Sequence, residues 1–301
     1  MLLRQMFNHP TFSYTYLLAD PVRAEAVLID PVKTKLRDYV QLANELGLAI
    51  TAAIDTHQHD DRASGIHSLR QLWNCDAIIG APRAEPADSR QVVDGDVIQV
   101  GGMQLKVLHT PGHTADSYSF LIEQPGKSAV FTGDTLLVRT LGLSNQESSD
   151  PSQHYNSLIN VLTQLPDDTI VYPGRDFKGW PLSTIGEEIA FNPYLQVETL
   201  EAFLELKERQ KPADIQPLVK VEEEDEAEEI ILTDVADFTA PASSDFYLPD
   251  DEADTVGGLD APEPDAAQAS KPESKPESKP DSKSEPGLEP IEDTSSVPSW
   301  R

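Results

Sequence analysis

The stretch Asp55 to Gly65 reads DTHQHDDRASG and combines two histidines with three aspartates in a short polar segment. It follows an apolar run, Leu48 to Ile54, that predicts a buried strand. His57, His59 and Asp61 occupy alternate positions, so in an extended loop their side chains project to one side. Imidazole and carboxylate groups together suit zinc or iron. We therefore expect a metal site here; the alternative is a solvated loop that is merely rich in histidine and aspartate.

Two later fragments supply further potential ligands. TPGHT follows the apolar run Met103 to Leu108, which places His113 just past a strand end on a Pro-Gly turn. FTGD delivers Asp134 from another apolar run, and Gly133 allows a close approach of the backbone. Each fragment alone is weak, but together they predict one shared site.

Composition limits the classes of function. The 301 residues include 52 acidic and 23 basic side chains, a formal net charge of −29. Such a field repels nucleic acid and anionic membranes, so we expect neither as a partner. The single cysteine, Cys75, excludes an intrachain disulfide, and its apolar context predicts a small buried side chain. The start, MLLRQMFNHP, lacks a basic stretch followed by a long apolar run, so we expect a cytoplasmic protein.

Apolar runs and turn residues predict a two-layer sheet core with helices outside, because the middle strands are joined by connections too short for crossovers. Strands are expected at 12–19, 24–29, 48–54, in short runs between 77 and 107, and at 117–122, 128–131 and 169–172. Helices are expected at 33–46, 64–73, 155–165, 184–191 and 196–209.

The composition changes near residue 210. Residues 211–301 hold 25 acidic and 7 basic side chains, a net charge of −18, and include an SKPE/SKPD repeat. Such a segment cannot bury enough apolar surface to offset its ordering entropy. We expect a folded domain at 1–209 and a disordered acidic tail at 210–301. Two apolar clusters in the tail, Ile230–Leu232 and Phe246–Leu248, are either docking motifs for an unknown partner or stray apolar residues.

The order of the ligand fragments, His-x-His-x-Asp and then His113 and Asp134, resembles the metallo-β-lactamase superfamily. Within it the chain is similar to the persulfide dioxygenases, and next to the glyoxalase II thioester hydrolases, over about residues 2–206. The stretches that carry this resemblance are RQMFNHPTFSYTYLLAD at 4–20, FTGDTLLVR at 131–139, VYPG at 171–174 and NPYL at 192–195. The resemblance implies an α/β (α+β) fold, a four-layer αββα sandwich with the metal at one edge between the sheets.

In the persulfide dioxygenases one non-haem Fe(II) is held by two histidines and one aspartate, which correspond here to His57, His113 and Asp134. The implied reaction oxidises a small-molecule persulfide, typically glutathione persulfide, with O2 to sulfite and thiol. A two-histidine, one-carboxylate set leaves adjacent positions open for both reactants. Spacing alone does not separate iron from zinc, so zinc stays open.

The resemblance also implies roles near the metal. His59 would lie beside the metal and, with Asp61, would shape the inner pocket. Thr114 is a candidate for a hydrogen bond near the metal. Tyr172 would line the pocket, as the matching tyrosine of the family does, or it only packs at a strand end.

Two arginines depart from the superfamily pattern. Arg62 replaces the last histidine of His-x-His-x-Asp-His, and Arg175 stands where a second metal-site histidine is expected. A guanidinium cannot bind a cation, so a two-metal hydrolytic mechanism is disfavoured. Either both arginines reach into the vacated site, neutralising Asp61 and orienting Asp134, or they point to solvent.

A further departure concerns substrate recognition. Gly142 to Asn145 replaces a Gly-Arg-Thr-Asp-like segment that helps to hold the substrate in the dioxygenases, which leaves Arg139 as the only basic residue of that stretch. Two other functions stay open: a one-metal hydrolase of thioesters, and a non-catalytic binding module whose acidic tail is the functional part. A homodimer also stays open.

Overall fold

Two six-stranded β-sheets form the centre of the protein in this computed structural model, which describes residues 1–81, 89–143 and 148–210. The first sheet consists, in spatial order, of β1 (Leu2–Asn8), β2 (Ser13–Asp20), β3 (Glu25–Ile29), β4 (Ala49–Ile54), β5 (Asp76–Gly80) and β6 (Arg90–Val92). Strands β1 to β3 pair antiparallel, whereas β3 to β6 run parallel. Helical crossovers make this possible for β3, β4 and β5.

The second sheet is mostly antiparallel. Its spatial order is β12 (Ser183–Thr184), β11 (Ile170–Pro173), β10 (Lys127–Gly133), β9 (Tyr118–Gln124), β8 (Met103–His109) and β7 (Val97–Val100). Both β8 and β10 pair antiparallel with β9, so they run in the same direction. Their carboxyl ends therefore meet at one edge of this sheet.

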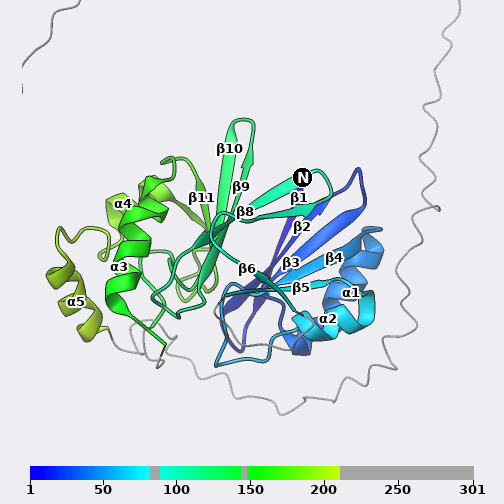
Figure 1. Cartoon of the computed structure of the whole chain (residues 1–301), viewed down its shortest axis with the longest axis horizontal. Coiled ribbons are helices and arrows are strands. Elements are labelled where there is room, and N and C mark those ends of the chain that lie inside the picture. Colours follow the sequence, from blue (N-terminus) through cyan, green and yellow to red (C-terminus); the bar gives the residue numbers. More distant parts are fainter. Residues whose placement is uncertain (82–88, 144–147, 211–301) are drawn as a thin grey trace, which may run out of the picture. The chain divides into compact units, whose positions relative to one another are not determined.

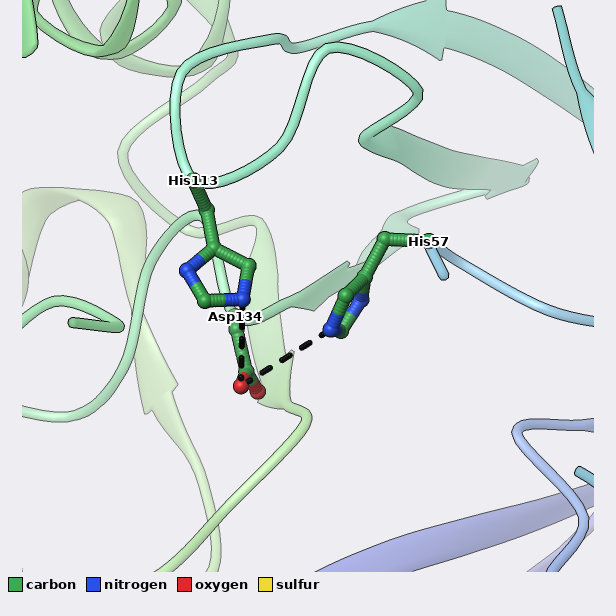
Figure 2. Close-up of side chains that lie close together, drawn as sticks. All are labelled: His57, His113 and Asp134. Atoms are coloured by element: carbon green, nitrogen blue, oxygen red, sulfur yellow. Dashed lines mark ion pairs between the residues drawn. The ribbon is translucent and has the colours of Figure 1, made fainter. Parts of the chain in front are cut away.

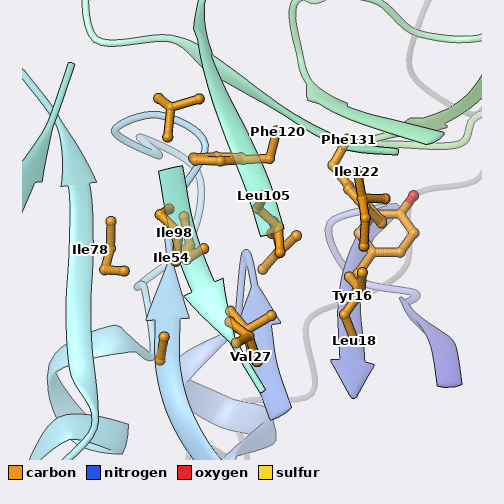
Figure 3. Packing of buried hydrophobic residues seen from close by; sticks show 14 of the residues in the cluster. Tyr16, Leu18, Val27, Ile54, Ile78, Ile98, Leu105, Phe120, Ile122 and Phe131 are labelled. Carbon is orange, nitrogen blue, oxygen red and sulfur yellow. The ribbon is translucent and has the colours of Figure 1, made fainter. Parts of the chain in front are cut away.

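The main apolar core lies between the two sheets (Figure 3). The first sheet contributes Tyr16, Leu18, Val27, Ile54 and Ile78, and the second contributes Ile98, Leu105, Phe120, Ile122 and Phe131. Strand β2 is buried on both faces, because Leu18 enters this core while its neighbour Leu17 packs toward the helices. Because both faces are buried, the sequence of this strand is a nearly continuous apolar run and does not alternate between apolar and polar residues.

Helices cover both outer faces of the sheet pair. A 3₁₀ turn (Lys33–Lys35) leads into α1 (Leu36–Glu45), which packs with α2 (Ile66–Trp73) on the first sheet. On the second sheet lie α3 (Pro151–Asn160), α4 (Ile185–Phe191), α5 (Leu200–Arg209) and a 3₁₀ turn (Leu162–Gln164). Figure 1 shows α1 and α2 on one side and α3, α4 and α5 on the other. The predicted four-layer αββα sandwich is confirmed.

Several element boundaries differ from those expected from periodicity. Helix α3 begins at Pro151 and not at residue 155, because the Asp150 side chain accepts from the backbone N–H groups of Ser152 and Gln153. Helix α5 begins at Leu200 and not at residue 196, because the Thr199 side chain caps it. Strand β1 was not predicted. It is an edge strand that pairs with β2, and its alternate apolar residues pack against the inter-sheet core (Leu3, Phe7) and the helix-side core (Leu2, Met6).

The proposed tail falls outside the described residues from position 211 onward, so its expected disorder and its docking clusters stay predictions, as does the domain boundary near residue 209. Within the described ranges, no helix is both long enough and apolar enough to cross a membrane.

Truncating Phe120 to alanine tests the inter-sheet core. Phe120 is fully buried, so Phe120→Ala should lower the free energy of unfolding by about 3–5 kcal/mol. The matched control is Phe191→Ala, whose ring is 64% exposed and should cost no more than about 1 kcal/mol. Urea unfolding followed by circular dichroism measures both, and equal losses would contradict this packing.

Candidate metal centre

Three side chains from three strand ends converge between the sheets. His57 follows β4 of the first sheet, whereas His113 and Asp134 follow β8 and β10 of the second. The Nε2 atoms of His57 and His113 lie 3.9 and 3.6 Å from Asp134 Oδ2. One potential ligand atom from each residue lies within 4.8 Å of the other two, and all three residues are buried. Figure 2 shows the two imidazoles and the carboxylate pointing toward one common volume.

Two glycines permit this convergence. Gly133 has φ +50°, and a Cβ there would lie 2.5 Å from Thr56 Oγ1, directly beside the His57 loop. Gly112 has φ +134°, and a Cβ there would lie 2.2 Å from the backbone nitrogen of His154. Larger residues would push apart the loops that carry the candidate ligands.

A hydrogen-bonded chain fixes the tautomer of His57. The Thr56 hydroxyl donates its only hydrogen to Asp30 Oδ2 at 2.9 Å, so the same oxygen accepts from His57 Nδ1–H, also at 2.9 Å. The backbone N–H of Thr56 donates to Asp30 Oδ1 at 2.7 Å. With hydrogen on Nδ1, the lone pair of His57 lies on Nε2, which faces Asp134.

His113 is oriented by a backbone carbonyl. Its Nδ1 lies 2.7 Å from the carbonyl oxygen of Leu143, which can only accept a hydrogen bond. The Nδ1 atom therefore carries the hydrogen, and Nε2 presents its lone pair toward Asp134. Both imidazoles thus expose the nitrogen that a metal ion requires.

The charge states of the three groups suit a divalent metal. Burial lowers the pKa values of His57 and His113, which keeps both rings neutral near pH 7. Burial alone would raise the pKa of Asp134, but Arg175 and the two imidazoles outweigh it and hold that pKa well below its usual value. Two neutral imidazoles and one carboxylate are a donor set that fits iron or zinc.

Arg175 links the two carboxylates near the site. Its Nε donates to Asp134 Oδ2 at 2.7 Å, and its Nη atoms bind Asp61 in a bidentate pair at 2.7 and 2.9 Å. Burial opposes the charge of this guanidinium, yet Asp134 and Asp61 raise its pKa. Arg62 lies elsewhere: its Nη1 donates to the Asp30 carbonyl at 3.1 Å, and its Nη2 lies 3.1 Å from His59 Nε2.

His59 stands beside the three convergent groups. Its ring centroid is 4.2 Å from that of His57, and its Nε2 lies 3.2 Å from Asp30 Oδ1. The buried Nδ1 atom of His59 has no hydrogen-bond partner among the described residues. Asp30, Asp55 and His59 form a second group with potential ligand atoms, but Thr56 and Ser64 already donate to its carboxylates.

Three other predicted residues have protein partners. The Thr114 hydroxyl lies 2.8 Å from the Ser117 hydroxyl. The Tyr172 ring stacks on Phe131, with centroids 5.1 Å apart. Arg139 has φ +59° and pairs with Glu187 and Glu188, so its guanidinium is already neutralised.

Sequence reasoning missed the supports of the ligands. Asp30 follows β3 in an Asp-Pro dipeptide, and its place at the end of a strand beside β4 was the signal that could have identified it. The Leu143 carbonyl left no sequence signal, because it acts through a contact with His113, thirty residues earlier in the chain.

The fold and this site agree with comparisons to known proteins. Residues 9–175 match the Metallo-beta-lactamase superfamily, and the chain belongs to that superfamily. It is similar to the bovine (Bos taurus) mitochondrial persulfide dioxygenase ETHE1, at 37% identity over 210 residues, 69% of this chain and 81% of that protein.

A solved structure gives the same relationship. The crystal structure of ETHE1 from Myxococcus xanthus is 39% identical, with a TM-score of 0.66, and the match covers 71% of this chain and 94% of that one. A hydroxyacylglutathione hydrolase from Francisella tularensis subsp. novicida is 31% identical over 196 residues, 64% of this chain and 75% of that protein.

Removing the Thr56 hydroxyl tests the support of His57. In Thr56→Val the ring loses the acceptor for Nδ1–H, so we expect metal affinity to fall about 10–100-fold with little change in shape. Thr56→Ser keeps the hydroxyl and should stay close to wild type. Competition of each protein with a chromogenic chelator measures the dissociation constants, and equal affinity for Thr56→Val and wild type would refute the role.

Acidification should destabilise the metal-free protein. His57, His59, His113 and His154 all have pKa values lowered by burial, so below pH 6.5 the unfolded chain binds more protons than the folded one. Stability should therefore fall from pH 7 to pH 5. His113→Asn removes one of these groups, so the slope of the free energy of unfolding against pH should decrease by up to about 1.4 kcal/mol per pH unit, the value for one proton. Urea unfolding across this range measures it, and a flat profile would contradict the burial.

Proposed function

We propose that the protein is a mononuclear non-haem iron dioxygenase that oxidises a low-molecular-weight persulfide, such as glutathione persulfide, with O2 to sulfite and thiol. His57 Nε2, His113 Nε2 and an Asp134 oxygen are the proposed ligands. An Fe(II) ion bound by such a set supplies adjacent open positions for the persulfide sulfur and for O2. The similarity to ETHE1 persulfide dioxygenases supports this reaction.

The Arg175 guanidinium is the observation that favours one metal over two. It binds Asp61 on one side and Asp134 on the other, the carboxylates that a second cation would need. A guanidinium keeps its positive charge and cannot act as a ligand, so it replaces the charge of a second metal without its Lewis acidity. A two-metal activation of water is therefore disfavoured.

The residues around the ligands have proposed supporting roles. His59 keeps an uncommitted ring nitrogen beside His57, and we assign it, together with Asp61, to shaping the inner pocket. For Tyr172 both roles stay open, lining the pocket or only packing at a strand end, because stacking on Phe131 does not prevent its ring edge from facing a pocket. For Thr114 and Arg139 the protein partners described above favour structural roles over contact with substrate.

A one-zinc thioester hydrolase is the second candidate. The similarity to a hydroxyacylglutathione hydrolase favours it, and the same three ligands would suit zinc with a bound water. A binding module without catalysis is the third. Cytoplasmic localisation, a homodimer, and a tail partner stay proposals from the sequence, and the bovine relative is named as mitochondrial.

Loss of one proposed ligand tests the function. Protein purified anaerobically should carry close to one iron per chain and consume O2 when glutathione persulfide is added. His113→Ala should lose both properties, because two ligands no longer hold the ion. The control is His109→Ala at the end of β8, whose ring stacks on Tyr118 and is not one of the convergent groups, so its loss should leave both properties.

Other outcomes separate the alternatives. Two tightly bound ions per chain, or thioester cleavage without O2 uptake, would contradict the dioxygenase and support a hydrolase. The two variants can also be compared in cells that lack the protein. If the chain truncated at residue 210 failed to restore the wild-type phenotype while His113→Ala restored it, the tail would be the functional part.

A further inference from the structure

The segment Leu141–Leu143 joins two of the proposed ligands. The N–H of Gly142 donates to the Asp134 carbonyl at 2.9 Å, and the Leu143 carbonyl accepts from His113 Nδ1 at 2.7 Å. A Cβ on Gly142 would lie 2.8 Å from His113 Nδ1 and 2.5 Å from the Asp134 carbonyl oxygen. Any shift of this segment therefore moves the His113 ring relative to the Asp134 backbone.

Two side chains at the C-terminal end of α5, Lys207 and the C-cap residue Gln210, donate hydrogen bonds to this segment. Lys207 Nζ donates to the Gly142 carbonyl at 2.6 Å, and Gln210 Nε2 donates to the Leu141 carbonyl at 2.9 Å. Lys207 Nζ also donates to Gln210 Oε1 at 3.0 Å, which couples the two side chains. The three successive carbonyls of the segment thus accept hydrogen bonds from Gln210, Lys207 and His113.

The burial of Lys207 is unfavourable for stability by itself. The residue is only 7% exposed, and both acceptors of its ammonium group are neutral. Among the described residues it forms no ion pair with a carboxylate, and its ammonium nitrogen lies 5.9 Å from the centroid of the Tyr194 ring, at the outer limit of a cation–π contact. Burial lowers its pKa to about 7. An apolar side chain would avoid this desolvation cost, so packing alone does not explain a lysine here.

We infer that Lys207 is a positioning residue of the metal centre, whose bond to the Gly142 carbonyl holds residues 141–143 where they orient the His113 imidazole. The inference rests on the proposed metal site but not on the identity of the substrate. Groups that hold ligands in place typically change metal affinity by 10–100-fold when removed. Gln210, bonded to Leu141, assists Lys207.

Lys207→Met provides the test, because methionine fills a similar volume without a donor. We expect the dissociation constant for Co(II) to rise about tenfold and the visible absorption bands of the Co(II) protein to shift. In the iron-loaded enzyme kcat should fall while KM for persulfide stays near wild type. The melting temperature should change little, because loss of the buried cation offsets the unsatisfied Gly142 carbonyl.

Controls separate positioning from folding and from the proposed function. Arg209→Met lies on the same helix, with a side chain that is 77% exposed, and should leave metal affinity and spectra unchanged. Gln210→Ala should give a smaller loss of affinity than Lys207→Met. Affinity and spectra of Lys207→Met equal to wild type, or a loss that only accompanies a large fall in melting temperature, would overturn the inference. Wild-type protein that binds no metal would instead refute the proposed function.

Discussion

A carboxylate buried at the edge of two packed sheets has to be balanced by positive charge, and the rest of the site follows from that constraint. Asp134 is almost fully buried, and burial alone would drive it to its neutral form. Arg175 keeps it ionised through a direct hydrogen bond and at the same time neutralises Asp61. The Asp134 carboxylate also faces two imidazoles whose Nε2 lone pairs can bind a cation. In the proposed site a single metal ion would satisfy that arrangement, whereas a second one would compete with the guanidinium.

The two imidazoles are oriented by opposite layers of the sandwich. His57 depends on the first sheet, through Thr56 and Asp30, while His113 depends on the second sheet and on α5, through residues 141–143. The relative positions of the two imidazole nitrogens therefore depend on how the two halves of the fold pack together. The groups in direct contact with the two rings are a hydroxyl and a backbone carbonyl, and the charged side chains of Asp30 and Lys207 act behind them.

Much of the candidate site could be predicted from the sequence. His57 and Asp134 lie in local motifs at the ends of apolar runs, and His113 follows a Pro-Gly turn, so spacing and composition identified them as potential ligands. Short connections between strands predicted a two-layer sheet core with helices outside, and the resemblance to the metallo-β-lactamase superfamily implied the full αββα order. The ends of α3 and α5 were misplaced, because capping by Asp150 and Thr199 overrides the apolar periodicity.

The sequence by itself, through its motifs and their resemblance to the metallo-β-lactamase superfamily, predicted the class of fold, the three candidate ligands and the arginines at positions 62 and 175 where that superfamily has histidines, since these properties reside in local residue order. Only the tertiary structure decided how the two arginines differ. Arg175 reaches the ligand carboxylate, whereas Arg62 lies against Asp30 and His59. It also brought Lys207, far along the chain, to the Gly142 carbonyl beside His113. Such contacts depend on how whole layers pack, and the direction of a long flexible side chain is fixed only when its surroundings are assembled.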